Sequence, residues 1–325
     1  MSAPLWQLSN VTLKGDRADR LADVSLQVRA GITAIVGHSG AGKTSLLNVL
    51  VGMERPSTGR LTQTIPATDP FSVPLFWAPQ DGGLWPHLTA REHLEAVFPR
   101  DSAQSAAGPA KCGEHLDNLL NGFDLHHRQH ALPGDLSQGE QSRLAIARAL
   151  AANPAVLVLD EPLSHVDPIR RPQYWTLIRE QIRGTSAALV FSTHEPDAAV
   201  RESEFSLCMN AGRIAWQGRT QDLYHHPPDK NVAEFLGPIN WFGSEDQAIW
   251  LPSFGPTVVG GVRPERITLE TAADSPVEIL SFRFCGSYSE STLKHLPSSR
   301  QKRIIHRPAG DHFRAGERVC MNVVR

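Results

Sequence analysis

Three short runs of mainly apolar residues constrain the fold of this chain more than any other feature of its sequence. They are Gly31 to Gly37, Ala155 to Leu159 and Ala187 to Phe191. Continuous apolar runs of this length are typical of strands that are buried on both faces of a parallel sheet. Helical patterns lie between them, as at Gly139 to Ala152 and Pro172 to Ile182. Alternating buried strands and helices predict an α/β core with a parallel sheet.

The segments around this core differ from it in pattern. Leu5 to Leu13 and Val24 to Val28 alternate apolar and polar residues, which predicts strands exposed on one face. Residues 83–135 contain short amphipathic pieces and predict a helical insert, with a flexible surface loop at Asp101 to Gly113. We expect a helical subdomain at about residues 83–150.

The pattern changes again after Leu236-Gly237-Pro238, where short β-like runs lie between Gly, Pro and Ser. This change predicts a small all-β barrel or sandwich. We therefore expect a larger domain at residues 1–236 and a smaller one at residues 237–325.

Composition narrows the functional classes. Apolar residues make up 41% of the 325 residues, charged residues 20%, and the net charge is -2, so no basic field indicates nucleic acid as a partner. Four cysteines lie far apart and are expected to be reduced thiols: Cys112, Cys208, Cys285 and Cys320. No signal peptide and no spanning helix are expected, which predicts a cytoplasmic chain that reaches a membrane only through partners.

A glycine-rich motif follows the first buried run. Gly37-His38-Ser39-Gly40-Ala41-Gly42-Lys43-Thr44 fits G-x-x-x-x-G-K-[ST] and precedes a predicted helix from Ser45 to Val51. Backbone N–H groups in such a loop surround phosphate oxygens, Lys43 reaches the β- and γ-phosphates, and Thr44 offers a hydroxyl to Mg²⁺. The predicted phosphate-binding residues are Gly37, His38, Ser39, Gly40, Ala41, Gly42, Lys43, Thr44 and Ser45.

Two acidic residues end the second buried run. Asp160 is placed to hold Mg²⁺, and Glu161 to orient or deprotonate the attacking water. Solvated acids at a strand end are common, but together with the glycine-rich motif they predict a nucleotide hydrolase.

Leu136-Ser137-Gln138-Gly139-Glu140 opens a predicted helix and narrows the class of hydrolase. With the motifs above, the chain resembles an ATP-binding-cassette ATPase, whose signature is L-S-G-G-Q with L-S-x-G-E as a frequent variant. Ser137 and Gly139 are retained. The resemblance implies a homodimer in which this helix start contacts the γ-phosphate of ATP bound to the other copy. Alone, the sequence would equally suit a helix cap.

Further matches follow in the family's order. Gln80 resembles the glutamine that contacts Mg²⁺ and the attacking water, and Asp167 in Ser164-His165-Val166-Asp167 resembles a loop residue that faces the partner copy. His194 resembles the histidine that binds the γ-phosphate and positions Glu161. The resemblance thus implies ATP and Mg²⁺ as ligands, with Thr44, Gln80 and Asp160 around the metal.

One stretch departs from the family. An aromatic side chain usually stacks on adenine about thirty residues before the loop lysine, but Val11 to Asp16 contains none. We expect a weaker apolar contact from Leu13, and the loss of the aromatic stack should cost about 1 kcal/mol in the free energy of ATP binding.

Two stretches resemble importer ATPases in particular. Gly83 to Glu92 resembles the segment that lines the groove for a permease helix, with Leu84 and Trp85 as the expected apolar anchors. Val262-Arg263-Pro264-Glu265 resembles the V-R-P-E hallmark of a small OB-like accessory domain. They imply permease subunits as partners and, indirectly, a solute-binding protein, with the chain peripheral on the inner face of the membrane.

Three alternatives stay open. A soluble cassette ATPase that acts on nucleic acid or ribosomes would favour two cassettes or a basic, aromatic surface. An exporter ATPase is disfavoured by the accessory domain. A catalytically silent scaffold is disfavoured by intact Lys43, Asp160, Glu161 and His194. The transported solute is not determined by the sequence.

Overall fold

The computed structural model describes residues 4–65, 73–99, 109–185, 187–251, 260–308 and 313–324. The chain divides into two compact units, Met1–Thr220 and Gln221–Arg325. Most of the predicted loop at Asp101 to Gly113 lies outside the described residues.

A six-stranded sheet forms the centre of the first unit, in the order β5-β6-β7-β3-β8-β9. Its strands are β3 (Ile32–Val36), β5 (Leu75–Ala78), β6 (Val156–Leu159), β7 (Ala188–Thr193), β8 (Phe205–Asn210) and β9 (Arg213–Arg219). All neighbours pair in parallel except β8 and β9. Every residue of β6 and β7 is buried. The predicted α/β core with a parallel sheet is confirmed.

An antiparallel sheet of three strands packs onto this core. Its order is β2-β1-β4, with β1 (Trp6–Leu13), β2 (Leu21–Val28) and β4 (Thr58–Gln63). The alternating residues predicted to point inward are buried in one cluster with helix α1 (Lys43–Leu50). The Trp6 indole Nε1 donates to the carbonyl oxygen of Leu50 at 2.8 Å, which ties the sheet to the end of α1.

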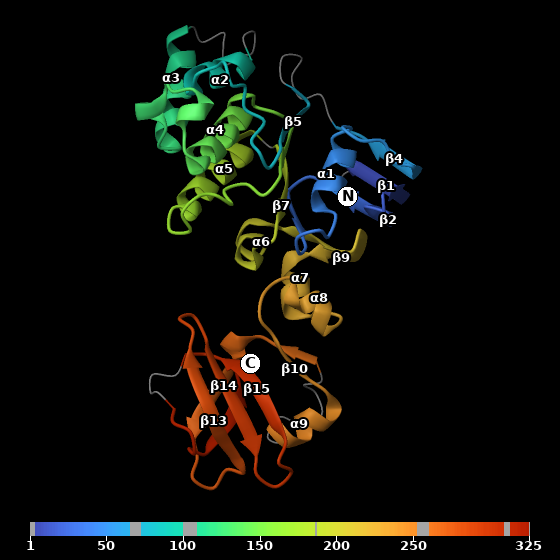
Figure 1. The fold of residues 1–325 in the computed structure, drawn as a ribbon, viewed down its shortest axis with the longest axis vertical. Helices are drawn as coiled ribbons and strands as arrows, with labels where there is room; N and C mark the ends of the chain where they lie inside the picture. Colours follow the sequence, from blue (N-terminus) through green and yellow to red (C-terminus); the bar gives the residue numbers. More distant parts are fainter. Residues whose placement is uncertain are drawn as a thin grey trace. The chain divides into compact units, whose positions relative to one another are not determined.

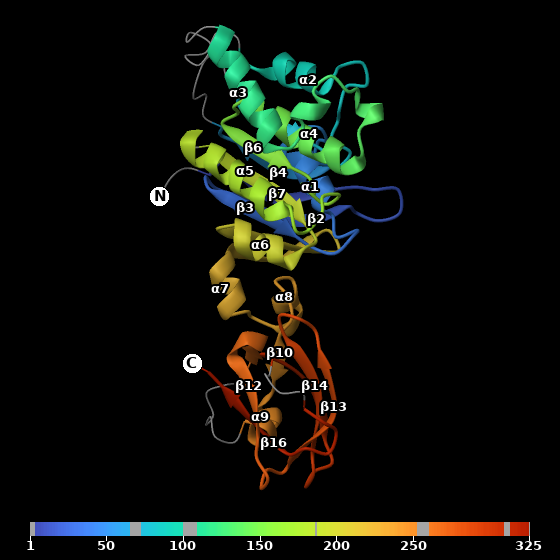
Figure 2. The ribbon, with the colours of Figure 1, turned by 90° about the vertical axis from the view of Figure 1, so that its left-hand side faces the viewer.

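Helices make up the insert between β5 and β6. They are α2 (Ala90–Val97), α3 (Pro109–Gly122) and α4 (Gln138–Ala151), with single 3₁₀ turns at His126–Arg128 and Pro133–Asp135. In Figure 1 the insert and the β2-β1-β4 sheet lie on either side of the central strands. Helices α5 (Arg171–Thr185) and α6 (Pro196–Glu202) follow β6 and β7 and lie along the sheet in Figure 2.

The second unit is built from small antiparallel sheets. Its strands are β10 (Asn240–Phe242), β11 (Gly260–Val262), β12 (Ile267–Thr271), β13 (Val277–Phe284), β14 (Ser289–His295), β15 (Gln301–His306) and β16 (Val319–Val323). They pair as β10-β11, β12-β16 and β13-β14-β15 around a core of their own. Short helices α7 (Thr220–His225), α8 (Lys230–Glu234) and α9 (Ser244–Trp250) accompany them.

A buried arginine explains why this unit begins earlier than the expected boundary at residues 236 and 237. The Arg263 side chain donates to the carbonyl oxygens of Tyr224 at 3.1 Å, Ala233 at 3.1 Å and Gly237 at 2.9 Å. Its guanidinium also lies over the Tyr224 ring, 4.3 Å from the centroid. Residues 224–237 are thereby bonded to the strand end at Val262, so they pack with the second unit.

Candidate active site

The glycine-rich loop joins β3 to α1 with backbone angles that favour glycine. Gly40 and Gly42 have φ values of 78° and 101°, which side chains rarely adopt. A Cβ on Gly37 would lie 2.7 Å from the carbonyl oxygen of Met209. Helix α1 begins at Lys43, two positions before the predicted Ser45, because Gly42 occupies its N-cap. Gly42 has no side chain to cap the first turn, so these N–H groups are available to an anion.

Lys43 is folded back onto the loop that it follows. Its side chain is 6% exposed, and Nζ donates to the carbonyl oxygens of Gly37 at 2.9 Å and His38 at 3.3 Å. Nζ also lies 3.3 Å from Glu161 Oε1. The buried ammonium is thus paired with a carboxylate at the loop, where a phosphate would offer further oxygens.

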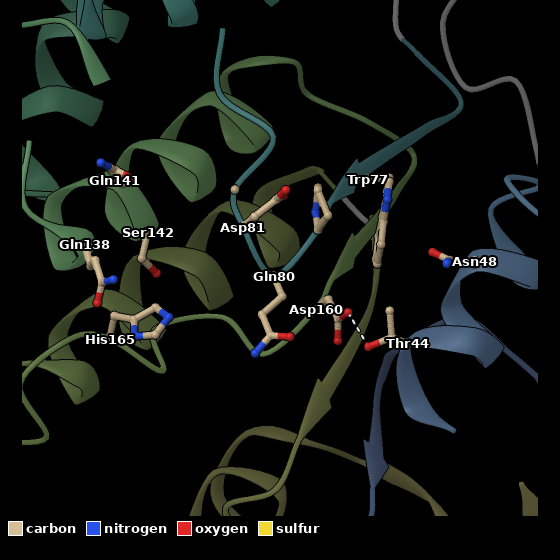
Figure 3. Close-up of a pocket in the computed structure, with 12 residues that line it drawn as sticks. Thr44, Asn48, Trp77, Gln80, Asp81, Gln138, Gln141, Ser142, Asp160 and His165 are labelled. Carbon is tan, nitrogen blue, oxygen red and sulfur yellow. Dashed lines mark hydrogen bonds between the residues drawn. The ribbon is translucent and has the colours of Figure 1, made fainter. Parts of the chain in front are cut away.

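Asp160 lies at the end of β6, facing the start of α1. Thr44 Oγ1 donates to Asp160 Oδ2 at 2.7 Å (Figure 3), and Asp160 is only 3% exposed. The Ser192 hydroxyl donates to Asp160 Oδ1 and accepts a hydrogen bond from the Glu161 backbone N–H at 2.9 Å. The motifs in the sequence do not indicate a role for Ser192. Its position at the end of β7, beside the end of β6, is the signal that points to it.

Three of the predicted catalytic side chains meet at Glu161. Its carboxylate lies 3.3 Å from Lys43 Nζ, 3.2 Å from His194 Nδ1 and 3.4 Å from Gln80 Nε2. Glu161 has a φ of 47°, a left-handed angle that costs free energy for a residue with a side chain. That backbone turn places the carboxylate beside the glycine-rich loop. The structure brings together Lys43, Gln80, Glu161 and His194, with the Thr44–Asp160 pair adjacent.

A pocket of about 630 Å³ opens beside this cluster. Thr44 and Asp160 line one end, Gln80 and Asp81 the middle, and Gln138 and His165 the other end (Figure 3). The pocket therefore runs from the glycine-rich loop to the start of α4.

The signature residues make local contacts instead. Ser137 is exposed and caps α4: its hydroxyl accepts from the Glu140 N–H at 3.2 Å, while the Glu140 carboxylate accepts from the Ser137 N–H at 2.8 Å. Burial raises the pKa of Glu140, but these hydrogen bonds lower it, so that the pKa lies below its ordinary value. The capping alternative is thus realised in the structure, with the first N–H groups of α4 at an exposed helix start.

Gly139 and Asp167 lie near this helix start. A Cβ on Gly139 would lie 3.0 Å from the His165 carbonyl oxygen, so glycine allows the 164–167 loop to pack closely against α4. Asp167 is exposed and accepts a hydrogen bond from the Ile169 N–H at 2.9 Å. These contacts hold the two residues in place and leave the Asp167 side chain facing solvent.

Leu13 does not take the position that we expected for it. It is 4% exposed and belongs to the core cluster between the β2-β1-β4 sheet and α1. The alternation of β1 directs it inward, so the expected apolar contact with a base is wrong for this side chain.

The segment at Gly83 to Glu92 forms a braced turn. The Trp85 side chain is 38% exposed and stacks on His93, with ring centroids 5.5 Å apart. The Arg148 guanidinium lies 4.7 Å from the Trp85 ring centroid and donates to the carbonyl oxygens of Gly82 and Gly83. Burial lowers the pKa of His93, and its Nε2 accepts a hydrogen bond from the Trp85 N–H at 2.9 Å. These contacts brace the turn, and part of the Trp85 side chain remains at the surface.

The chain was compared with known proteins. The family model described as ABC transporter matches residues 21–164. The Fe(3+) ions import ATP-binding protein FbpC of Brucella melitensis is 35% identical over 238 residues, which cover 71% of this chain and 65% of that protein. The chain therefore spans slightly less than two thirds of that relative's length.

Other relatives match over more or different parts of the chain. The Fe(3+) ions import ATP-binding protein FbpC 2 of Pectobacterium atrosepticum is 30% identical, with 93% of both chains covered. The putrescine transport ATP-binding protein PotG of Escherichia coli is 31% identical over 74% of this chain and 63% of that protein.

Solved structures agree with the fold. An ATP-binding cassette in a dimeric post-hydrolysis state with ADP and Pi has a TM-score of 0.56 and 25% identity, over 66% of this chain and 98% of that one. The ATP-binding subunit of an ABC transporter has a TM-score of 0.57 at 23% identity, which shows the fold alone. On the relative that matches over nearly its whole length, the chain belongs to the ABC transporter family.

Proposed function

We propose that the chain is the ATP-hydrolysing subunit of an ABC importer. The observation that carries this proposal is the convergence of Lys43, Gln80 and His194 on the Glu161 carboxylate, beside the Thr44–Asp160 pair. This set contains a phosphate-binding loop, a candidate base in Glu161, and two polar side chains that contact that base, Gln80 and His194. It suits the transfer of a phosphoryl group to water.

The residues of the loop bind the phosphates of ATP. N–H groups at the start of α1 donate to phosphate oxygens, and Lys43 exchanges its contact with Glu161 for one with the γ-phosphate. Glu161, released from Lys43, is then free to orient water and accept its proton. His194 and Gln80 hold the Glu161 carboxylate in position from the other side.

Mg²⁺ is the metal that the oxygen donors fit. Thr44 Oγ1 and Asp160 Oδ2 are 2.7 Å apart, and two protein oxygens beside a phosphate site are typical of Mg²⁺, which keeps several waters. Gln80 lines the same pocket and is proposed to act through one of those waters. When bound, the ion would neutralise charge that develops on the phosphate oxygens.

The active unit is proposed to be a homodimer. Ser137, Gly139 and Asp167 lie at an exposed helix start and an exposed loop, so a second copy can present them to the nucleotide held by the first. Within the described part of one copy, the Ser137 side chain caps its own helix. The first N–H groups of α4 would then face the γ-phosphate across the interface.

Import is supported by the relatives, which are named for Fe(3+) and putrescine transport. The described helices include none that is both long enough and apolar enough to span a bilayer. We therefore infer that the chain works at the cytoplasmic face through permease subunits, which take solute from a solute-binding protein. The exposed part of Trp85 and its neighbour Leu84 form the proposed permease contact, and residues 237–325 the OB-like accessory domain.

ATP hydrolysis by the purified chain tests the proposal. We expect turnover that requires Mg²⁺ and that rises more steeply than linearly with protein concentration, because two copies share each site. Turnover that persists in EDTA, or a strictly linear dependence, would contradict the proposed mechanism. For the permease contact, Trp85→Asp should reduce the fraction of the chain that sediments with membranes in its host. An unchanged membrane-bound fraction would contradict that contact.

A further inference from the structure

Arg171 connects two loops that the proposed mechanism treats separately. It is the first residue of α5, and its guanidinium bonds backward to the 164–167 loop: Nε donates to the Val166 carbonyl oxygen at 2.8 Å and Nη2 to that of Ser164 at 3.1 Å. Nη1 lies 2.5 and 2.6 Å from the two carboxylate oxygens of Glu195. One side chain thus holds the loop of Asp167 and the residue that follows His194.

The position of Arg171 is unfavourable for its own helix. The N-terminus of a helix favours negative charge, yet α5 has no acidic residue in its first turn and begins with an arginine. The Glu195 carboxylate offsets that cost, and only 19% of the Arg171 side chain is exposed. Helix stability alone would favour a different residue at the first position of α5. This indicates that the role of Arg171 lies in the contacts of its guanidinium.

His194 depends on its backbone for its position. Its side chain is 48% exposed, so packing holds it weakly, and its contact with Glu161 at 3.2 Å is long. Glu195, the next residue, makes two contacts: its N–H donates to Thr193 Oγ1 at 2.9 Å, and its carboxylate pairs with Arg171. Arg171 thus bonds the 164–167 loop to the residue that follows His194.

We propose that Arg171 is a positioning residue that couples the 164–167 loop to His194. Contact of the partner copy with this loop fixes the position of the Arg171 guanidinium, which in turn fixes the position of Glu195. His194, the preceding residue, then holds the Glu161 carboxylate for catalysis. This inference rests on the proposed ATPase function. It adds a reason why hydrolysis would require the second copy, because the loop that faces that copy also fixes the position of His194.

The chain offers a matched control on the same helix. Arg179 of α5 donates to Glu202 at the end of α6 at 2.7 Å, with side chains 30% and 6% exposed. This pair also ties α5 to α6, but it contacts neither the 164–167 loop nor His194. Glu195 is the N-cap residue of α6, so Arg171→Gln and Arg179→Gln each remove one ion pair between α5 and the segment of α6. Only the first removes the proposed coupling.

Two measurements test the proposal. We expect Arg171→Gln to lower kcat for ATP about tenfold or more while the KM for ATP stays within about twofold, as for a residue that orients a catalytic group. Arg179→Gln should change neither beyond about twofold. Arg171→Lys should recover kcat only in part, because a single ammonium nitrogen lacks the planar fork with which the guanidinium reaches Val166, Ser164 and Glu195 at once. The NMR signal of the His194 ring, assigned by its loss in His194→Gln, should shift in Arg171→Gln and stay in place in Arg179→Gln.

Equal kcat values for the two glutamine variants, with an unmoved His194 signal, would overturn the coupling while the ATPase function stood. A wild-type chain without turnover would overturn the proposed function, and the His194 signal would still decide the coupling. If Arg171→Gln fails to fold, Glu195→Gln replaces it, because this change removes the charge and keeps the shape. The same kcat loss and signal shift are expected from it, and their absence would count against the proposal.

Discussion

The two halves of the candidate site differ in how far one copy of the chain completes them. Around the glycine-rich loop, Lys43, Thr44, Asp160, Glu161 and His194 are bonded to one another, and Lys43 and Asp160 are almost fully buried. At the start of α4, Ser137 is exposed, and its side chain is bonded within its own capping box. The first half is assembled before ligand binds, whereas the second is an exposed helix start. A site divided in this way suits catalysis that begins only when two copies meet.

Glu161→Gln should produce the largest change, because it removes the group on which the assembled half converges. We expect kcat for ATP to fall by about 10² to 10⁴, the range for loss of a general base. Nucleotide binding should persist, because the loop and Lys43 are intact. Stopped-flow turnover and equilibrium binding of a fluorescent ATP analogue measure the two effects. Loss of binding in parallel with kcat would show that Glu161 holds the loop together and does not act in chemistry.

Ser192→Ala should weaken the same half through its buried bridge. The change leaves Asp160 Oδ1 and the Glu161 N–H without their shared partner, at a cost of about 1–3 kcal/mol in the free energy of unfolding. Urea denaturation measures this cost. Ser289→Ala in the second unit is the matched control, since this buried hydroxyl has no hydrogen-bond partner among the described residues. The control should be neutral or stabilising, and equal losses in both variants would contradict the role of the bridge.

Ser137→Ala should have a smaller effect on the folding of one copy. It removes an N-cap, which costs about 1 kcal/mol. Thermal melts of the ligand-free chain measure it, with Thr89→Ala as a control because Thr89 forms the same capping box at α2. A loss well above that of Thr89→Ala would mean that Ser137 has further contacts within its own copy, and the contrast between the halves would weaken.

The smallest effect is expected from acidification at the braced turn. Burial lowers the pKa of His93 below 6.5, although its hydrogen bond to the Thr89 carbonyl opposes the shift. Below about pH 6.5 the unfolded chain therefore binds a proton at His93 more readily than the folded chain does. The contribution of neutral His93 to the free energy of unfolding is thus complete above about pH 6.5 and is lost as the pH decreases. Tm should drop between about pH 7.5 and pH 5.5. His93→Asn should reduce that drop, and an equal drop in this variant would contradict the role of His93.

The sequence predicts the assembled half well, because its elements follow local rules. Gly40 and Gly42 require positive φ, Asp160 ends a buried strand, and the motifs fix the spacing of Lys43 and Thr44. The fold class follows from the same apolar runs. These features depend on short segments, so they can be recognised without knowledge of the tertiary contacts.

The features that sequence reasoning missed all depend on contacts between distant segments. Ser192 becomes important only because β7 lies beside β6, and Arg171 only because the 164–167 loop and Glu195 meet at its guanidinium. The expected contact of Leu13 with a base is wrong because the core partners of this side chain, on α1, are far away in the sequence. The sequence shows Arg263 only as part of a short motif. In the structure Arg263 bonds backbone carbonyl groups near the start of the second unit, and no sequence pattern identifies those carbonyl groups.

The molecular mass of the Glu161→Gln chain in solution tests the division of the site most directly. With ATP and Mg²⁺, light scattering should give the mass of two copies, because the nucleotide is held and not hydrolysed. Adding Ser137→Arg to this variant should return the mass to one copy while each chain still binds one ATP. A double variant that remains dimeric with ATP would contradict the account, as would a Glu161→Gln chain that stays single when saturated with nucleotide.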